Sequence, residues 1–151
     1  DYLGAKSNVT VSSQELSIDD TSSNEPEGEY FFSSIIDTGT SRDARVTGFR
    51  TFTRSYDGAT LLWDDIPEKI DSWPGLFDNW TDEDNNFGGV SVMVYVSTTE
   101  DDPSGSPTWT NYEPANGSFY QGRAFRFKAV LTSSNSSYTP SVSGLSVKVE
   151  Y

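Results

Sequence analysis

Apolar and polar residues alternate along the last third of the chain. From Phe125 to Leu131 every second side chain is apolar, and basic side chains lie between them. The alternation returns, after a polar turn, from Leu145 to Tyr151. A repeat of two residues is typical of a strand that buries one face and exposes the other. The pattern therefore predicts a β-hairpin over Arg123–Tyr151 with one apolar face.

Similar patterns predict further strands, separated by polar turns. These strands are 29–38, 44–56, 59–63, 90–98 and 109–112, with a turn at 39–43. In the predicted strand 44–56, Val46 and Phe49 are an odd number of residues apart and would lie on opposite faces of a regular strand. Gly48 lies between them, and this predicts a β-bulge.

The number of short strands and the lack of a long amphipathic helix predict the fold class. Roughly eight or nine strands joined by turns are typical of an all-β, antiparallel β-sandwich or jelly roll. A length of 151 residues suits one domain over 1–151. Because the sequence starts at Asp1 without Met, we expect a fragment of a longer chain or a processed product.

Residues 64–89 interrupt the series of strands. This segment is rich in Asp and Glu, and it contains Trp73 and Trp80. Pro67 and Pro74 disfavour regular structure there. We expect a long acidic excursion from the sandwich, and such ordered loops are often functional.

Composition excludes several classes of function. The net charge of −13 disfavours nucleic acid and anionic membranes as partners. The chain has no Cys and no His, which excludes disulfides, thiol nucleophiles, Ser-His-Asp triads and most transition-metal sites. No apolar run approaches the ~20 residues that span a bilayer, so we expect no membrane insertion.

An acidic run in the excursion resembles the start of a calcium loop. Its candidate metal ligands are Asp82, Asp84 and Asn86. The rest of the EF-hand pattern fails, because Phe87 replaces the sixth-position Gly and Met93 the closing Glu. A solvated acidic loop without a cofactor is the simpler interpretation. A calcium-stabilised adhesin domain is the alternative, and a melting temperature unmoved by chelator would exclude it.

Tryptophans and nearby polar side chains predict a sugar-binding surface. The candidate ligand-binding residues are Trp73 and Trp80 with Asp78 and Asn79. Trp63, Trp109 and Tyr112 could belong to the same surface. For two of them we favour a structural role instead: Trp109 packs over the end of the sandwich, and Trp63 ends a core strand.

Charged side chains elsewhere predict no catalytic site. We interpret Arg123, Arg126 and Lys128 as structural and solubilising cations on the wet face of a strand. Paired carboxylates near the tryptophans could suggest a glycosidase. No such pair is anchored on a strand, so we predict that the protein is not an enzyme.

The runs STTEDDPSGSPTWTNYEP (97–114) and GRAFRFKAVLTSSNSSYTPSVSGLSVKVEY (122–151) resemble a β-rich module of phage tail proteins. The family comprises tail-tip and central tail-fibre (host-specificity) proteins. The resemblance implies a jelly-roll sandwich of the galactose-binding type, located in the virion tail. As partners it implies copies of the chain, usually in a homotrimer, and other tail proteins. It also implies assembly in the host cytoplasm, with the virion extracellular once released. No catalytic residue of the family maps onto this chain.

Two hypotheses on function follow. The first is a non-enzymatic structural or adhesion module of a phage tail fibre or tail tip, which contributes to host attachment, through a host surface glycan, or to fibre assembly. The alternative is a carbohydrate-binding module of a bacterial polysaccharide-active enzyme, and a neighbouring hydrolase domain in the native gene would favour it.

Overall fold

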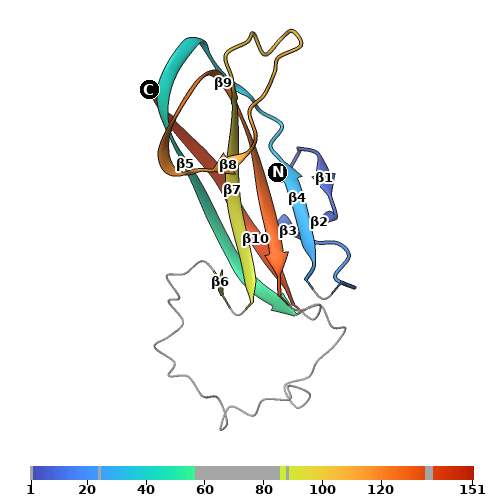
Figure 1. Cartoon of the computed structure of the whole chain (residues 1–151). Coiled ribbons are helices and arrows are strands. Elements are labelled where there is room, and N and C mark those ends of the chain that lie inside the picture. The colour runs from blue at the N-terminus through green and yellow to red at the C-terminus, as the bar shows by residue number, and fades with distance from the viewer. Residues whose placement is uncertain (1, 24, 57–85, 88, 135–137) are drawn as a thin grey trace, which may run out of the picture.

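The computed structural model describes residues 2–23, 25–56, 86–87, 89–134 and 138–151, and all regular structure in these ranges is β-strand (Figure 1). The strands are β1 (Lys6–Ser7), β2 (Val9–Ser12), β3 (Glu15–Ile18), β4 (Glu27–Phe31), β5 (Ile36–Tyr56), β6 (Asn86–Phe87), β7 (Val90–Thr99), β8 (Glu113–Pro114), β9 (Asn116–Ser133) and β10 (Tyr138–Glu150). The all-β class predicted from alternation is confirmed. The predicted strand 59–63 lies outside the described residues.

The strands form one antiparallel sheet that curls over on itself. Its main path runs in the order β1-β4-β9-β5-β10-β3-β2, while β7 pairs with β9, and β6 and β8 pair with β7. The ends of the path, β1 and β2, are separated in sequence by Asn8 alone. Asn8 has a left-handed backbone with φ 51°, a conformation that Asn tolerates better than most residues. Its side-chain amide donates hydrogen bonds to the carbonyls of Asp20 and Glu27. One residue thus connects the two ends of the sheet.

The core lies between the inner faces of the curled sheet. The alternating residues of β9 are buried: Phe125, Phe127, Ala129 and Leu131 are each at most 3% exposed. Alternate valines of β7 and side chains from β2, β3, β4, β5 and β10 complete two contiguous apolar clusters. Burial of each large apolar side chain stabilises the fold by about 1.5–3 kcal/mol.

The predicted hairpin over Arg123–Tyr151 is wrong, because β9 and β10 are not hydrogen-bonded to each other. β9 pairs with β4, β5 and β7, whereas β10 pairs with β5 and β3. Leu131 of β9 and Val142 of β10 instead belong to the same core cluster. The reason is that alternation reports which face of a strand is buried, and says nothing of which neighbour the strand pairs with.

The predicted bulge at Gly48 is also wrong. Pairing of β5 with β10 continues without interruption through Gly48, and its register shift falls between Val142 and Gly144 on β10. On the other side of β5, the pairing with β9 shifts register between Arg45 and Thr47, just before Gly48. Phe49 is 51% exposed, on the outward side of β5. A Cβ on Gly48 would lie 2.5 Å from the Cβ of Val94. Gly48 therefore allows the close approach of β5 and β7 across the core.

Other boundaries differ from the predicted ones. The predicted strand 29–38 is divided between β4 and the start of β5. The predicted turn 39–43 lies within β5, where the pairing with β9 shifts register between Asp37 and Arg42 and Gly39 has φ 77°. Residues 109–112 form no strand, and β8 begins at Glu113.

Candidate functional site

Most of the site residues predicted from sequence lie outside the described residues. These are Trp73, Asp78, Asn79, Trp80, Asp82 and Asp84. Asn86 lies in β6, where it is paired with Ser91 of β7. In the part of the chain that is described, no group of three or more Asp, Glu, His or Cys side chains could hold a metal ion. The predicted glycan and calcium residues therefore stay predictions.

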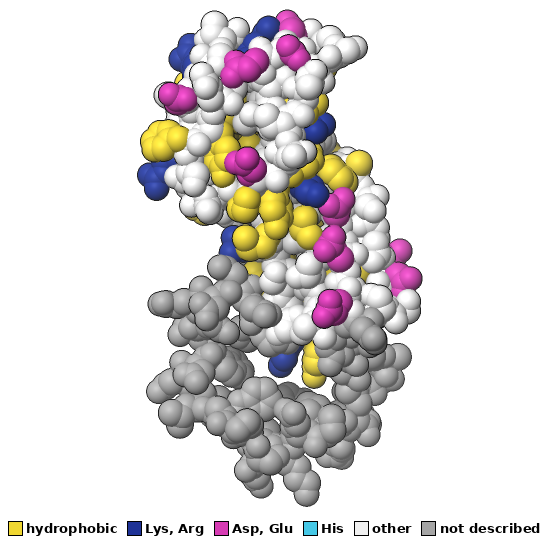
Figure 2. Space-filling view, in the orientation of Figure 1, with side chains coloured by type: hydrophobic (Ala, Val, Ile, Leu, Met, Phe, Trp, Pro, Cys, Tyr) yellow, Lys and Arg dark blue, Asp and Glu magenta, His cyan; other side chains and the backbone are white. Residues whose placement is uncertain are grey.

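A second aromatic surface lies on the outward side of β4, β7 and β9. Because Phe125 and Phe127 point into the core, Arg126 and Lys128 point outward. Aromatic side chains from three separate parts of the chain surround these two cations. We call this surface the aromatic–basic face; its members are Phe31, Tyr95, Trp109, Tyr112, Arg126 and Lys128. In the orientation of Figure 1, Figure 2 shows hydrophobic side chains over these strands with charged side chains beside them.

Strand register brings the members of the aromatic–basic face together. Lys128 of β9 is directly opposite Phe31 of β4 on one side and Tyr95 of β7 on the other. Arg126, two residues before it, is opposite Ser97. Directly opposed side chains of neighbouring strands have Cβ atoms roughly 4.5–5.5 Å apart, which is close enough for contact.

Arg126 is held between two aromatic rings. Its guanidinium carbon lies 4.5 Å from the ring centroid of Trp109 and 5.1 Å from that of Tyr112. Its Nε donates a hydrogen bond to the Oγ of Ser97 at 3.2 Å. Cation–π contacts of this kind contribute about 0.5–1 kcal/mol at exposed sites. The Arg126 side chain therefore has one preferred orientation.

Lys128 is held by an ion pair as well as by rings. Its Nζ lies 4.9 Å from the ring centroid of Tyr112 and forms an ion pair with Glu29. Phe31 meets the same Tyr112 ring edge-on, with centroids 6.4 Å apart. Burial raises the pKa of the Tyr112 phenol, an effect that the nearby Arg126 and Lys128 charges oppose.

The loop before β8 places Trp109 and Tyr112 on this face. Thr110 fastens the loop to β7: its N–H donates to the carbonyl of Thr98 at 2.9 Å, and its Oγ1 accepts from the N–H of Thr98 at 2.9 Å. The Oγ of Ser97 donates to the carbonyl of Thr110 at 2.7 Å. Trp109 is partly buried and packs against Arg126, so its predicted packing over the end of the sandwich stays a prediction.

An ion cluster at the start of the same loop is structural. The guanidinium of Arg123 pairs with Asp102 at 2.8 Å and with Asp37 at 3.2 Å. Hydrogen bonds from Ser104, and then from Arg123, lower the pKa of Asp102 to about 2. The prediction that Arg123 has a structural role agrees with this geometry.

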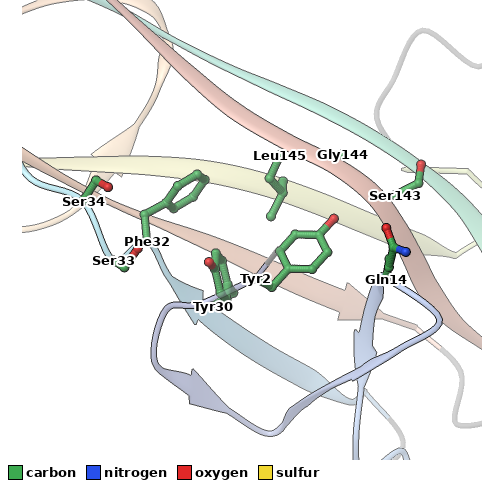
Figure 3. A pocket seen from close by; sticks show the side chains of 9 residues that line it. All are labelled: Tyr2, Gln14, Tyr30, Phe32, Ser33, Ser34, Ser143, Gly144 and Leu145. Carbon is green, nitrogen blue, oxygen red and sulfur yellow. The ribbon is translucent and has the colours of Figure 1, made fainter.

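A pocket of ≈ 330 Å³ lies between the end of β4 and the bulge in β10 (Figure 3). Tyr2, Tyr30, Phe32 and Leu145 supply its apolar walls, and neutral side chains such as Gln14 supply polar groups. The phenol of Tyr2 donates to the carbonyl of Val142 at 2.7 Å, and that of Tyr30 accepts from the N–H of Gly4 at 3.1 Å. Since both phenols already bond to the backbone, we interpret the pocket as the place where the N-terminal segment closes the core.

The comparisons with known proteins add no identification. No known protein family, no curated protein and no solved structure matches this chain. Among its described residues there is no helix long and apolar enough to cross a bilayer. Function must therefore be argued from the aromatic–basic face itself.

Sequence reasoning found only part of this face. It named Trp109 and Tyr112 as candidates for a sugar-binding surface, and it placed Arg126 and Lys128 on the wet face of a strand. It did not bring the two pairs together, because Tyr112 and Arg126 belong to different elements. The sequence feature that could have connected the two pairs is the length of the loop between β7 and β8, which allows the loop to fold back onto β7.

Proposed function

We propose that this chain is a non-enzymatic module of a phage tail fibre or tail tip that contributes to host attachment by binding a surface glycan on the aromatic–basic face. Partly exposed rings beside fixed polar groups suit a sugar, which presents both apolar C–H surfaces and hydroxyl groups. The resemblance of residues 97–114 and 122–151 to tail modules supports the role in a tail.

One observation carries the proposal. Trp109 and Tyr112 are placed on the outer side of the sheet by a loop that Thr110 fastens to β7. The core clusters contain neither ring. Two large, partly exposed rings that lie outside the core clusters and beside Arg126 support a preformed recognition surface.

The same proposal includes the finer fold. We propose that the curled sheet is a jelly-roll sandwich, with β4, β7 and the second half of β9 in one layer and β5, β10 and β3 in the other. The contact of Val94 with the backbone at Gly48 across the core supports two closely packed layers. Self-association and contacts with other tail proteins stay predictions from the resemblance.

The experiment replaces the two rings and measures adsorption. We expect Trp109→Ala with Tyr112→Ala to weaken adsorption of the labelled protein to host cells by about tenfold or more, a loss of about 1.4 kcal/mol or more. Tyr151→Ala is the matched control, because Tyr151 is 69% exposed and contacts Arg42, outside this face. Light scattering and thermal melting report assembly and folding separately. Unchanged adsorption by the folded double variant would refute the proposal.

A further inference from the structure

Arg126 contacts two rings and Ser97, yet most of its N–H donors form no hydrogen bond to the described residues. Arginine carries five N–H donors. For Arg126 one of them, on Nε, bonds to Ser97. Within the described ranges no carboxylate lies within 4.0 Å of this guanidinium, whereas Arg123 has two such partners and Lys128 has one. The terminal nitrogens of Arg126 are therefore available to a ligand.

Among the described residues, the neighbouring cations of β9 differ in their partners: Arg123 and Lys128 pair with carboxylates, and Arg126 does not. Glu29, which lies beside this face, pairs with Lys128 and compensates its charge. Within the described part of the chain the charge of Arg126 has no such compensation, and a ligand with one negative charge would balance it.

Orientation of the side chain lowers the cost of binding. A freely rotating arginine loses conformational entropy when a ligand immobilises it. Here the two rings and Ser97 have already restricted Arg126. A planar guanidinium in a fixed orientation matches a planar carboxylate through two parallel hydrogen bonds.

We propose that Arg126 binds the carboxylate of an acidic sugar, beside the rings of Trp109 and Tyr112. This inference rests on the proposed glycan-binding function and names its ligand class. A carboxylate with one charge fits better than a phosphate monoester, which carries about −1.5 to −2 at neutral pH.

The test uses an array of bacterial capsular and lipopolysaccharide glycans, each printed in its native form and after chemical reduction of its carboxyl groups to alcohols. We expect the wild-type chain to bind native acidic glycans and to lose about tenfold or more of its affinity when their carboxyls are reduced. Arg126→Gln should lose a similar factor on the native glycans and nothing further on the reduced ones. Arg126→Lys should recover part of the affinity, because it keeps the charge and loses the planar fork.

Arg42→Gln is the matched control, since Arg42 also lies over an aromatic ring, 5.4 Å from the centroid of Tyr151. It should bind as the wild type does. If Arg126→Gln fails to fold, the reduced glycans still test the inference on the wild-type chain.

Three outcomes contradict the inference, and they are distinguishable. Equal binding to native and reduced glycans would refute the acidic ligand and leave the proposed function intact. Binding only to phosphorylated or sulfated glycans would refute the proposal that the ligand group is a carboxylate. Failure of the wild-type chain to bind any glycan would refute the proposed function, and this inference with it.

Discussion

Phe119 and Phe125 lie on the same strand, β9, an even number of residues apart, yet their environments are opposite. Phe119 is 72% exposed and Phe125 is 0% exposed. Simple alternation would put both rings on one face. The alternation breaks between the two rings, because the consecutive residues Ala124 and Phe125 are both buried. At this point β9 changes its inward face as it passes from its pairing with β5 to its pairing with β7.

The two phenylalanines form a matched pair for a stability measurement. Phe125→Ala leaves a cavity in the core and should lower the free energy of unfolding by about 3–5 kcal/mol. Phe119→Ala removes an exposed ring and should change it by less than about 0.5 kcal/mol. Urea denaturation of both variants would measure the difference. Equal losses would mean that Phe119 is covered in solution.

At the scale of elements, the contact of β5 with β7 depends on a missing side chain. Gly48 lies against Val94, and the N–H of Gly48 donates to the carbonyl of Ala115 at 2.8 Å. Ala115 in turn donates to the carbonyl of Val94 at 2.8 Å. This bridge joins the two strands across the edge of the core, in a space that leaves no room for a Cβ.

Gly48→Ala should therefore strain the approach of β5 to β7. Overpacking of this kind costs about 1–3 kcal/mol, and chemical denaturation would measure it. Gly144→Ala is a suitable comparison, because its nearest contacts would be at 3.6 Å, an ordinary packing distance. Trimming Val94 to Ala in the Gly48→Ala background should restore part of the loss in a double-mutant cycle. Strictly additive losses would contradict the proposed clash.

At the scale of the whole molecule, the ordinary pKa values of the side chains lie towards the two ends of the pH range. The chain has no His and no Cys, so no side chain has an ordinary pKa between about 5 and 8. The pKa of Asp102 is lowered to about 2, mainly by Ser104, and that of Asp37 is lowered chiefly by the N–H of Gly39. Burial raises the pKa values of the phenols of Tyr2 and Tyr112.

These shifts predict a broad plateau of stability. Because their pKa values are lowered in the folded state, the ionised carboxylates stabilise the fold at pH values above the unfolded pKa of about 3.9. This stabilisation is lost as the pH falls towards about 2. Because their pKa values are raised in the folded state, the neutral phenols contribute stability at pH values below the unfolded pKa of about 10. This stability is lost as the pH rises through the pKa of the folded state. The urea midpoint should therefore be constant from about pH 5 to 8 and fall outside it. Asp102→Asn should make the urea midpoint fall less steeply at acidic pH. A stability maximum between about pH 5 and 8 would contradict the assignment of the pH dependence to these carboxyls and phenols.

Local signals explain why some elements were predictable and others were not. The alternation in β7 and in the second half of β9 identified the buried faces correctly, because burial on one side of a strand leaves a direct record in sequence. The turn between β2 and β3 left no such record. Ser13 and Gln14 occupy it with φ of 52° and 67°, where Asn-Gly or Asp-Gly is the usual signal.

The candidate site was predictable only in pieces. Trp109 and Tyr112 are conspicuous as aromatics in a polar loop, and Arg126 and Lys128 as outward positions of a strand. Their meeting depends on how Thr110 fastens the loop to β7 and on the register of β4 and β7 along β9. Neither arrangement can be inferred from periodicity, because register and loop packing are set by contacts between distant residues.

By itself, the sequence determined that this protein is all-β, which side of β7 and of the second half of β9 is buried, and that His and Cys chemistry is excluded. These properties follow from residue type and a period of two, both of which are local. The tertiary structure alone decided that β9 and β10 share a core cluster without pairing, that Gly48 lies against Val94, and that Arg126 contacts both Trp109 and Tyr112. Each depends on which strands become neighbours, and long-range packing, which the local pattern does not encode, selects those neighbours.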